Sequence, residues 1–372
     1  MKIKSISLHH IEMKLKSPFV SSLGKIQNRE CIIVEIVDES GTTGWGEAVA
    51  FSSPWYTEET TKTCWHMMED FLIPIVFSTK IEHPLEVIEL FKTLKRNNMA
   101  KAGLEGAIWD LYAKQRGITL SEAVGGIRKK IAAGVVVSID SKDKMLNKID
   151  FHLKEGYERI KVKIKPGQDY DVIKTIRSNF PEAPLMADAN SAYTLHDVNK
   201  LKALDKFHLK MIEQPLASDD LLEHSKLQKQ IKTPICLDES IVTYDDARKA
   251  IELGSCQVIN IKIGRVGGIS IAKKIHDLCR DNYIPVWCGG MLETGISRAH
   301  NIAIASLPHF SLPGDISASS RYWEKDIIVP EVTMENGQIN VPTTPGIGYE
   351  INKQQLKKVT RYTKSFTNPK SM

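Results

Sequence analysis

The chain has 372 residues, which is long for one ordinary compact domain and suits a barrel plus a second domain. Its apolar fraction of 42%, charged fraction of 26% and scattered net charge of +5 are those of an ordinary globular protein and do not indicate nucleic-acid binding. No run approaches the roughly 20 apolar residues of a membrane helix, so we expect neither nucleic acid nor membrane as a partner. The six cysteines lack metal-site spacing and no signal-peptide pattern is present, which predicts a reducing, cytoplasmic location.

The first 125 residues are expected to form an α+β domain. Two alternating runs, 2–15 and 30–40, predict strands of an antiparallel meander. Segment 101–116 carries apolar residues at helical spacing, and Gly117 follows it in the position of a helix-ending glycine.

Beyond residue 130 the chain changes to a repeating pattern. Short apolar runs alternate with helical patterns, and this order predicts a parallel β/α barrel. The eight strand candidates are 132–139, 158–164, 183–188, 208–213, 233–238, 256–262, 284–290 and 310–316. From residue 321 strand-and-turn patterns return, and we expect this segment to pack back onto the N-terminal domain. Its basic end, 357–372, is expected to be a solvated tail.

Five charged residues end successive strand candidates at gaps of 25, 25, 25 and 24 residues: Lys163, Asp188, Glu213, Asp238 and Lys262. One strand, one helix and two short loops account for such a pitch. Because a barrel places its active site at the carboxyl ends of its strands, we expect all five side chains to meet at one mouth.

The three carboxylates predict a divalent metal site. Asp188, Glu213 and Asp238 offer only hard oxygen ligands, which favour Mg²⁺ or Mn²⁺ over zinc. Three carboxylates this close would repel one another without a cation between them. The alternative is that each acid forms a separate salt bridge at a strand end.

The two lysines predict proton transfer. Lys163 and Lys262 are expected to face each other across the mouth, and burial beside a cation makes a lysine usable as a base near neutral pH. Lys161 shares a strand face with Lys163 and either supplies that positive charge or orients Lys163. Lys165 has the same two-residue spacing to Lys163, but we assign it to the following loop. The metal would stabilise the enediolate formed when a carbon acid beside a carboxylate loses its proton.

Four neighbours of these residues are further candidates. Asn190 lies on the same side as Asp188, and Asn260 on the same side as Lys262. Glu239 either supports one of the lysines or caps the strand end. Arg265 either binds a substrate carboxylate or caps the following helix, and we favour the structural role.

The ordered motifs resemble the enolase superfamily, in particular its muconate-lactonizing-enzyme branch. They are KVK at 161–163, DAN at 188–190, EQPL at 213–216, DES at 238–240 and NIKIGRVGG at 260–268. The stretch 287–319 is more specific and is similar to the group of o-succinylbenzoate synthases and N-succinylamino acid racemases. The resemblance covers essentially the whole chain.

The resemblance implies a (β/α)₇β barrel at 126–320 with an α+β capping domain built from residues 1–125 and completed by 321–372. It implies Mg²⁺ ligands at Asp188, Glu213 and Asp238, a general acid/base at Lys163 and an opposing catalytic lysine at Lys262. A capping loop at 17–29 would close over the site or be an ordinary hairpin connection. The candidate lid residues are Phe19, Ser21, Ser22 and Gly24, and Gly289, Gly290, Met291 and Leu292 would line the substrate pocket, together with Lys161 and Asn190.

The activity implied by the resemblance is an Mg²⁺-dependent syn-dehydration that gives 2-succinylbenzoate from a small carboxylate substrate. The alternative is racemisation of N-succinylamino acids, in which both lysines carry protons, one on each face. The strand-eight region lacks the DxD pair that resembles dipeptide epimerases. A non-catalytic metal-binding scaffold is the remote alternative, and the sequence leaves the oligomeric state open.

Overall fold

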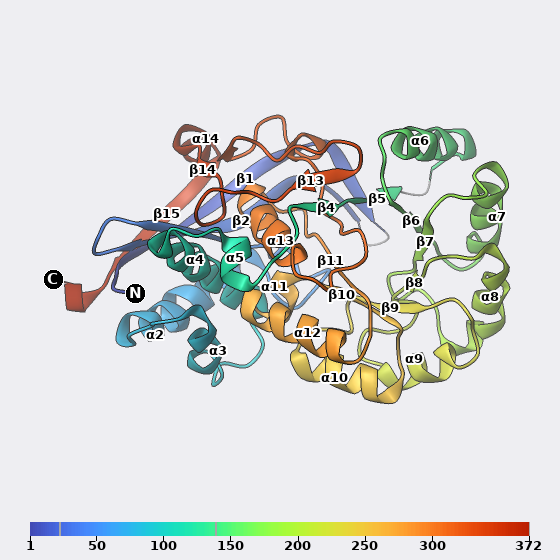
Figure 1. Cartoon of the computed structure of the whole chain (residues 1–372), viewed down its shortest axis with the longest axis horizontal. Helices are drawn as coiled ribbons and strands as arrows, with labels where there is room; N and C mark the ends of the chain where they lie inside the picture. Colours follow the sequence, from blue (N-terminus) through green and yellow to red (C-terminus); the bar gives the residue numbers. More distant parts are fainter. Residues whose placement is uncertain (22–23, 138–139, 372) are drawn as a thin grey trace.

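Four antiparallel strands gather two distant parts of the chain into one sheet (Figure 1). The computed structural model describes residues 1–21, 24–137 and 140–371. The sheet has the order β15-β1-β2-β3 and consists of β1 (Ile3–Ser21), β2 (Gly24–Asp38), β3 (Thr43–Ala48) and β15 (Thr360–Thr367). Ile6 of β1 pairs with Ile36 on one side and Phe366 on the other. The predicted meander is therefore present.

The basic C-terminal stretch forms a strand, whereas the sequence predicted a solvated tail. β15 pairs with β1 along its length. Thr, Tyr and Phe in this stretch favour an extended strand, and most of its side chains are exposed at the sheet edge. The prediction failed because counting charges ignores the alternating β-formers between them.

The helices of this region are α1 (Thr61–Met67), α2 (Ile73–Ser78), α3 (Val87–Leu90), α4 (Asn98–Arg116) and α5 (Leu120–Val124), with a π-helical turn at Met68–Leu72, and α4 and α1 pack against the sheet. The longest, α4, ends as predicted at Gly117, whose φ of +65° suits a residue without a side chain. It packs closely on β3, because a Cβ at Gly46 would lie 2.0 Å from the carbonyl oxygen of Gly103. We call residues 1–125 together with β15 the capping domain.

Seven parallel strands form the barrel, in the unbroken order β11-β10-β9-β8-β7-β6-β5. They are β5 (Gly134–Val137), β6 (Arg159–Lys163), β7 (Leu185–Asp188), β8 (Ile212–Glu213), β9 (Ile235–Leu237), β10 (Val258–Ile261) and β11 (Val286–Cys288). The eighth predicted strand, 310–316, is an irregular closing segment. It still joins the two ends of the sheet, because Gly134 N donates to Gly314 O and Asp315 N donates to Cys288 O. Pro313 has no N–H to donate, which explains why a regular ladder does not form there.

The barrel helices are α6 (Lys142–Lys154), α7 (Asp169–Asn179), α8 (Val198–Ala203), α9 (Leu221–Gln228), α10 (Tyr244–Leu253), α11 (Ile263–Val266), α12 (Ile269–Asp281) and α13 (Gly295–Ala305). Two small two-stranded sheets are also present: β4 (Lys130–Ala132) pairs with β13 (Gln338–Asn340), and β12 (Ile328–Val329) pairs with β14 (Glu350–Ile351). The helix α14 (Lys353–Val359) follows β14. Across the described ranges, none of the helices has the length and apolar character that crossing a bilayer would require.

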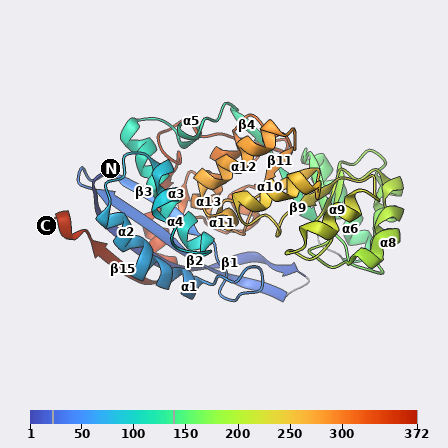
Figure 2. The ribbon, with the colours of Figure 1, turned by 90° about the horizontal axis from the view of Figure 1, so that it is seen from below.

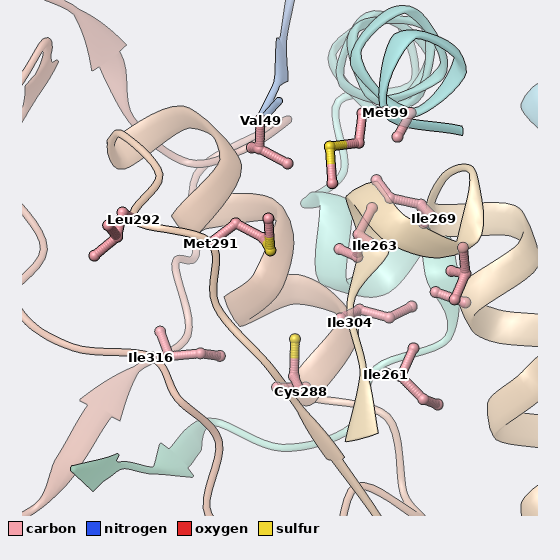
Figure 3. Packing of buried hydrophobic residues seen from close by; sticks show 14 of the residues in the cluster. Val49, Met99, Ile261, Ile263, Ile269, Cys288, Met291, Leu292, Ile304 and Ile316 are labelled. Atoms are coloured by element: carbon pink, nitrogen blue, oxygen red, sulfur yellow. The ribbon is translucent and has the colours of Figure 1, made fainter. Parts of the chain in front are cut away.

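One hydrophobic core continues from the capping domain into the barrel. Val49 and Met99 of the capping domain face Ile263 and Ile269, which follow β10 (Figure 3). The long hairpin of β1 and β2 extends beyond the other two strands of the sheet and runs along the barrel (Figure 2). The described fold is thus the predicted barrel with a capping domain placed over it.

Two buried carboxylates of the capping domain bind helix starts in the barrel. Glu105 of α4 accepts hydrogen bonds from the backbone N–H groups of Ile269 and Ser270, both at 2.8 Å. Glu47 of β3 accepts from the backbone N–H and the hydroxyl of Thr294, which precedes α13. Since free N–H groups at a helix start attract negative charge, these contacts attach the capping domain firmly to α12 and α13.

Candidate active site

A cavity of about 450 Å³ lies between the capping domain and the carboxyl ends of the barrel strands. Each of the five regularly spaced residues stands at the end of its strand or directly after it. The capping domain supplies an aromatic wall of Phe19, Phe51, Trp55 and Tyr56, and the barrel supplies the charged floor. The structure therefore brings the widely separated candidates of the sequence to one place.

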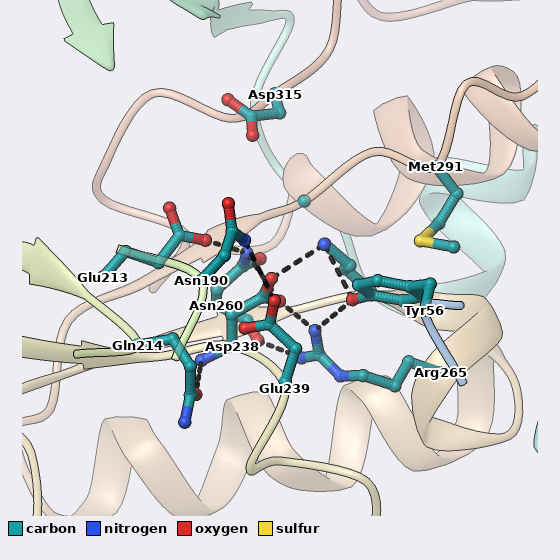
Figure 4. Close-up of polar contacts among 12 residues, drawn as sticks. Tyr56, Asn190, Glu213, Gln214, Asp238, Glu239, Asn260, Arg265, Met291 and Asp315 are labelled. Atoms are coloured by element: carbon teal, nitrogen blue, oxygen red, sulfur yellow. Dashed lines mark hydrogen bonds and ion pairs between the residues drawn. The ribbon is translucent and has the colours of Figure 1, made fainter. Parts of the chain in front are cut away.

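Three buried carboxylates lie at the centre of the barrel mouth. Asp188 and Glu213 are direct partners in the β7–β8 pairing. The Asn260 amide nitrogen donates to Glu213 Oε1 at 2.9 Å and to Asp238 Oδ1 at 3.0 Å (Figure 4). The three acids are at most 2% exposed. One amide thus links two of them, and the third is the strand neighbour of one of these.

Cationic side chains bind all three carboxylates. Lys161 Nζ lies 3.0 Å from Glu213 Oε2 and 3.6 Å from Asp188 Oδ2. Lys262 Nζ lies 2.9 Å from Asp238 Oδ2, and Arg265 pairs with the other oxygen of Asp238. In the described part of the chain, no three His, Cys, Asp or Glu side chains are grouped so as to hold a metal ion. This arrangement differs from the expected triad facing a single ion, because Asp188 and Glu213 share Lys161 as a partner and Asp238 is turned toward Lys262 and Arg265.

The donor set nevertheless fits a divalent cation. Burial first, and then the negative charges of Asp188 and Asp238, raise the pKa of Glu213 well above its usual range. A nearby positive charge stabilises a carboxylate whose ionised form is disfavoured in this way. All the available donors are hard oxygens, which Mg²⁺ and Mn²⁺ prefer.

Lys161 is held deeper in the barrel than the sequence indicated. Its ammonium also lies 2.5 Å from Asp315 Oδ2, and the second oxygen of Asp315 accepts from Arg159 at 2.5 Å. Both cations lie over the ring of Trp287, with the charged groups 4.3 and 4.9 Å from its centre. Burial alone would lower the pKa of Lys161, but Asp315 and the other carboxylates raise it well above its usual range. Lys161 is therefore a permanent cation within the floor of the cavity.

Lys163 is bound by groups of the barrel alone. Its Nζ donates to Asp188 Oδ2 at 2.7 Å and to Asn190 Oδ1 at 2.5 Å. The Asn190 amide nitrogen in turn donates to Glu239 Oε1 at 3.0 Å, which fixes the amide with its oxygen toward the lysine. Glu239 thus contacts Lys163 indirectly, through Asn190, which agrees with its expected support of a lysine.

Lys262 is bound from both domains. Its Nζ donates to Asp238 Oδ2 at 2.9 Å and to the hydroxyl of Tyr56 at 2.8 Å. Burial would lower the pKa of Lys262, but the charge of Asp238 raises it well above its usual range. Arg265 donates to the carbonyl oxygens of Ile241 and Asn260 at 2.7 and 2.6 Å, and it is 2% exposed. These contacts agree with the structural role favoured for Arg265, although the residue also lines the cavity.

The lid and pocket candidates divide into three groups. Phe19, Gly290, Met291 and Leu292 line the cavity. Gly289 does not line it, and a Cβ there would lie 2.7 Å from Lys262 side-chain carbons, so this glycine gives the lysine room. Of the other lid candidates, Ser22 lies outside the described residues, and Ser21 and Gly24 are the end of β1 and the start of β2.

Sequence reasoning missed three residues of this site. Tyr56 lies in a segment with no regular pattern, so only its aromatic neighbours could have drawn attention to it. Asp315 lies in a predicted strand and ends no 25-residue repeat. Gln214 accepts from the backbone N–H groups of Asp238 and Ser240 at 3.0 and 3.2 Å and so fixes the Asp238 backbone. The position of Gln214 directly after Glu213 is the feature of the sequence that could have identified it.

Two family models match consecutive parts of the chain. Residues 3–125 match the mandelate racemase / muconate lactonizing enzyme N-terminal domain. Residues 144–355 match the enolase C-terminal domain-like family. Together they cover most of the capping domain and of the barrel, with β5 and β15 outside the matched ranges.

Curated relatives extend the similarity over nearly the whole chain. The chain is 58% identical over 367 residues to an o-succinylbenzoate synthase of Geobacillus kaustophilus, covering 98% of both chains. It is 44% identical over 361 residues to an N-succinylamino acid racemase of Thermus thermophilus, covering 97% of this chain and 98% of the relative. A crystal structure of an enolase-superfamily member from Listeria innocua superposes with a TM-score of 0.97 at 42% identity, covering 99% of this chain and 100% of that one.

Proposed function

The chain belongs to the enolase superfamily, and from this membership we propose that it is an o-succinylbenzoate synthase of menaquinone biosynthesis. The reaction would remove water from 2-succinyl-6-hydroxy-2,4-cyclohexadiene-1-carboxylate and give 2-succinylbenzoate. The supporting observation is the pair of lysines in one cavity, each bound to an acidic side chain of the same carboxylate cluster. The 58% identity to a synthase over 98% of the chain supports the choice of reaction.

Lys163 would transfer both protons of the dehydration. It removes the proton from the carbon that bears the carboxylate, and the electron pair delocalises into that carboxylate as an enediolate. The pair then forms the new ring double bond as the C–O bond to the hydroxyl breaks. In a syn elimination the leaving oxygen lies on the same face, so Lys163 returns its proton to that oxygen and water departs.

Lys262 would stabilise negative charge from the opposite face. The charge of Asp238 holds it in the ammonium form, and its contacts to Asp238 and Tyr56 occupy two of its three N–H groups. The third can reach into the cavity. A preorganised cation in a site that excludes water stabilises developing anionic charge strongly.

Asp188, Glu213 and Asp238 would hold a divalent cation, for which we propose Mg²⁺ with Mn²⁺ as a substitute. When bound, the ion would act as a Lewis acid toward the substrate carboxylate. Occupation would require the lysine and arginine contacts of these carboxylates to be shared with the ion. The six buried, unpaired cysteines fit a reducing compartment, so we place the enzyme in the cytoplasm.

The test is an assay of the purified chain on the hydroxycyclohexadiene substrate, with the aromatic product followed by ultraviolet absorbance. We expect product with Mg²⁺, none after treatment with EDTA, and recovery when Mg²⁺ is restored. Absence of product with Mg²⁺, combined with racemisation of an N-succinylamino acid under the same conditions, would reject the synthase and retain the superfamily chemistry.

Racemisation of N-succinylamino acids is the second candidate activity. The observation that favours it is that both lysines are fixed in one cavity, since racemisation needs one proton carrier on each face. The 44% identity to a racemase supports it less strongly. Exchange of the α-proton of both enantiomers in deuterated water, followed by proton NMR, tests this activity independently of dehydration.

A further inference from the structure

Tyr56 is the one residue of the capping domain that forms a recorded hydrogen bond to either of the two lysines in the described structure. It lies between β3 and α1, on a segment closed by a bridge between Phe51 and Thr60. Its ring packs against Phe51 and Trp55, with ring centres 6.4 and 6.1 Å away. The tyrosine is thus anchored in the capping domain while its hydroxyl reaches the barrel (Figure 4).

The Tyr56 hydroxyl accepts hydrogen bonds from two cations. Lys262 Nζ donates at 2.8 Å and Arg265 donates at 3.2 Å. Burial raises the pKa of Tyr56, so the phenol stays neutral and serves as a fixed acceptor. An ammonium group has three donors, and Asp238 and Tyr56 occupy two of those on Lys262. The direction of the third is set by the other two.

Lys163 also has two of its three N–H groups engaged in hydrogen bonds, but its acceptors come from a different part of the molecule. Asp188 and Asn190 both come from the end of β7, in the barrel. Substitution of Tyr56 therefore removes one acceptor from Lys262 and none from Lys163. Hydrogen bonds to charged groups are the stronger kind, so the loss should displace Lys262 measurably.

We propose that Tyr56 is a positioning residue for Lys262, and that through it the capping domain controls the second lysine and hence the balance between racemisation and dehydration. The proposal rests on the proposed function. Racemisation requires Lys262 to transfer a proton, whereas in the dehydration Lys163 moves both protons and Lys262 only supplies charge. Loss of the hydroxyl should therefore affect racemisation more than dehydration.

The first experiment measures α-proton exchange in deuterated water for each enantiomer of N-succinylphenylalanine, with saturating Mg²⁺. Lys262→Ala identifies the enantiomer that Lys262 serves, because its exchange is lost. We expect Tyr56→Phe to slow exchange of that enantiomer by about tenfold or more, and exchange of the other by less than about threefold. Equal losses for both enantiomers, or no loss, would overturn the proposal.

The second experiment uses dehydration alone and is a double-mutant cycle under single-turnover conditions. Tyr56→Phe should slow dehydration by about threefold to tenfold in the natural background and by less than about twofold when Lys262 is already alanine. The matched control is Tyr322→Phe. Tyr322 lines the same cavity, and in the described structure no recorded hydrogen bond joins its hydroxyl to either lysine. Its effect should be the same in both backgrounds.

The two experiments separate this proposal from the proposed function. If the chain dehydrates but exchanges neither enantiomer, the racemase activity is absent and the cycle decides the role of Tyr56. If it exchanges protons but does not dehydrate, the synthase is rejected and the exchange experiment decides. A Tyr56→Phe effect of undiminished size in the Lys262→Ala background would mean that Tyr56 does not act through Lys262.

Discussion

The barrel and the capping domain contribute different kinds of group to the same cavity. The barrel supplies the charged side chains at its strand ends, among them Lys163 and Lys262, and these side chains contact one another. The capping domain supplies an aromatic wall that includes one phenol, Tyr56, and two acidic residues, Glu58 and Glu59, that also line the cavity. Strand ends hold charged groups in fixed geometry, whereas a loop and a hairpin shape the space above them. Both lysines therefore belong to the barrel, and Lys262 alone of the two is also hydrogen-bonded to a described side chain of the capping domain.

The two domains are nevertheless tightly joined. Glu105 binds the start of α12, the second helix after β10, and Glu47 binds the start of α13, the helix after β11. These helices lie just beyond Lys262 and the pocket residues Met291 and Leu292. The capping domain therefore stabilises the same part of the barrel to which Tyr56 is hydrogen-bonded.

The largest effect should come from the lysine that is held by the barrel alone. Lys163→Ala is expected to slow dehydration by about 10³- to 10⁴-fold, because the general base is lost. Mg²⁺ binding measured by calorimetry should persist, since the three carboxylates remain. The matched control is Lys165→Ala, an exposed lysine two residues along the chain. Turnover near the normal rate in Lys163→Ala would contradict the assignment of the base.

The second lysine should separate the two activities. Lys262→Arg keeps a positive charge but replaces a group that can release a proton by one that cannot. We expect racemisation to fall by about 10²-fold or more and dehydration to fall clearly less. Polarimetry and product absorbance measure the two. Lys274→Arg, on the exposed face of α12, is the control, and unchanged racemisation in Lys262→Arg would refute the use of two bases.

The attachment between the domains should appear as stability. Glu105→Ala leaves the Ile269 and Ser270 N–H groups without their side-chain acceptor, and it leaves the Trp109 indole N–H with the Ser270 hydroxyl as its acceptor. We expect the free energy of unfolding in urea to fall by about 3 kcal/mol. Glu252→Ala, at the exposed end of α10, should change it by less than about 0.5 kcal/mol. Equal effects of the two substitutions would show that Glu105 does not hold the domains together.

The smallest effect should be a pH dependence at the same interface. Burial lowers the pKa of His300 to about 4, and its ring lies against α4, since a Cβ at Gly106 would be 2.8 Å from the ring. Below the ordinary value of about 6.5 the unfolded chain binds a proton that the folded chain does not, so stability falls as the pH falls toward 4. The contribution lost by pH 5 is about 2 kcal/mol.

Urea unfolding of His300→Gln at pH 7 and pH 5 measures this contribution. The difference in stability between the two pH values should be about 2 kcal/mol smaller than in the natural protein. His196→Gln, an exposed histidine, should leave that difference unchanged. An unaltered pH dependence in His300→Gln would mean that His300 is not the group responsible.

The regular half of the molecule could be predicted from the sequence because a β/α unit has a nearly constant length. That length placed Lys163, Asp188, Glu213, Asp238 and Lys262 at strand ends, and the structure brings their side chains into one site. The same pattern predicts the barrel, the resemblance adds the capping domain over it, and the fold confirms both. Their assigned roles stay predictions until the substitutions are tested.

The remaining contacts could not be predicted because no pattern in the sequence records them. Tyr56 and Lys262 are 206 residues apart and belong to different domains. Asp315 binds Lys161 from a closing segment that Pro313 keeps irregular. The sequence alone does not distinguish separate salt bridges from a shared ion, and the structure contains salt bridges of all three carboxylates at the strand ends.

The pairing of β15 with β1 has a consequence for the order in which the protein assembles. Ile6 lies opposite Phe366, so the partner of the first strand is synthesised only after the entire barrel. Until then one side of β1 is an uncovered edge, open to association with other chains. During synthesis the chain is therefore prone to association with other chains until β15 pairs with β1. Slow translation of the barrel would lengthen this period.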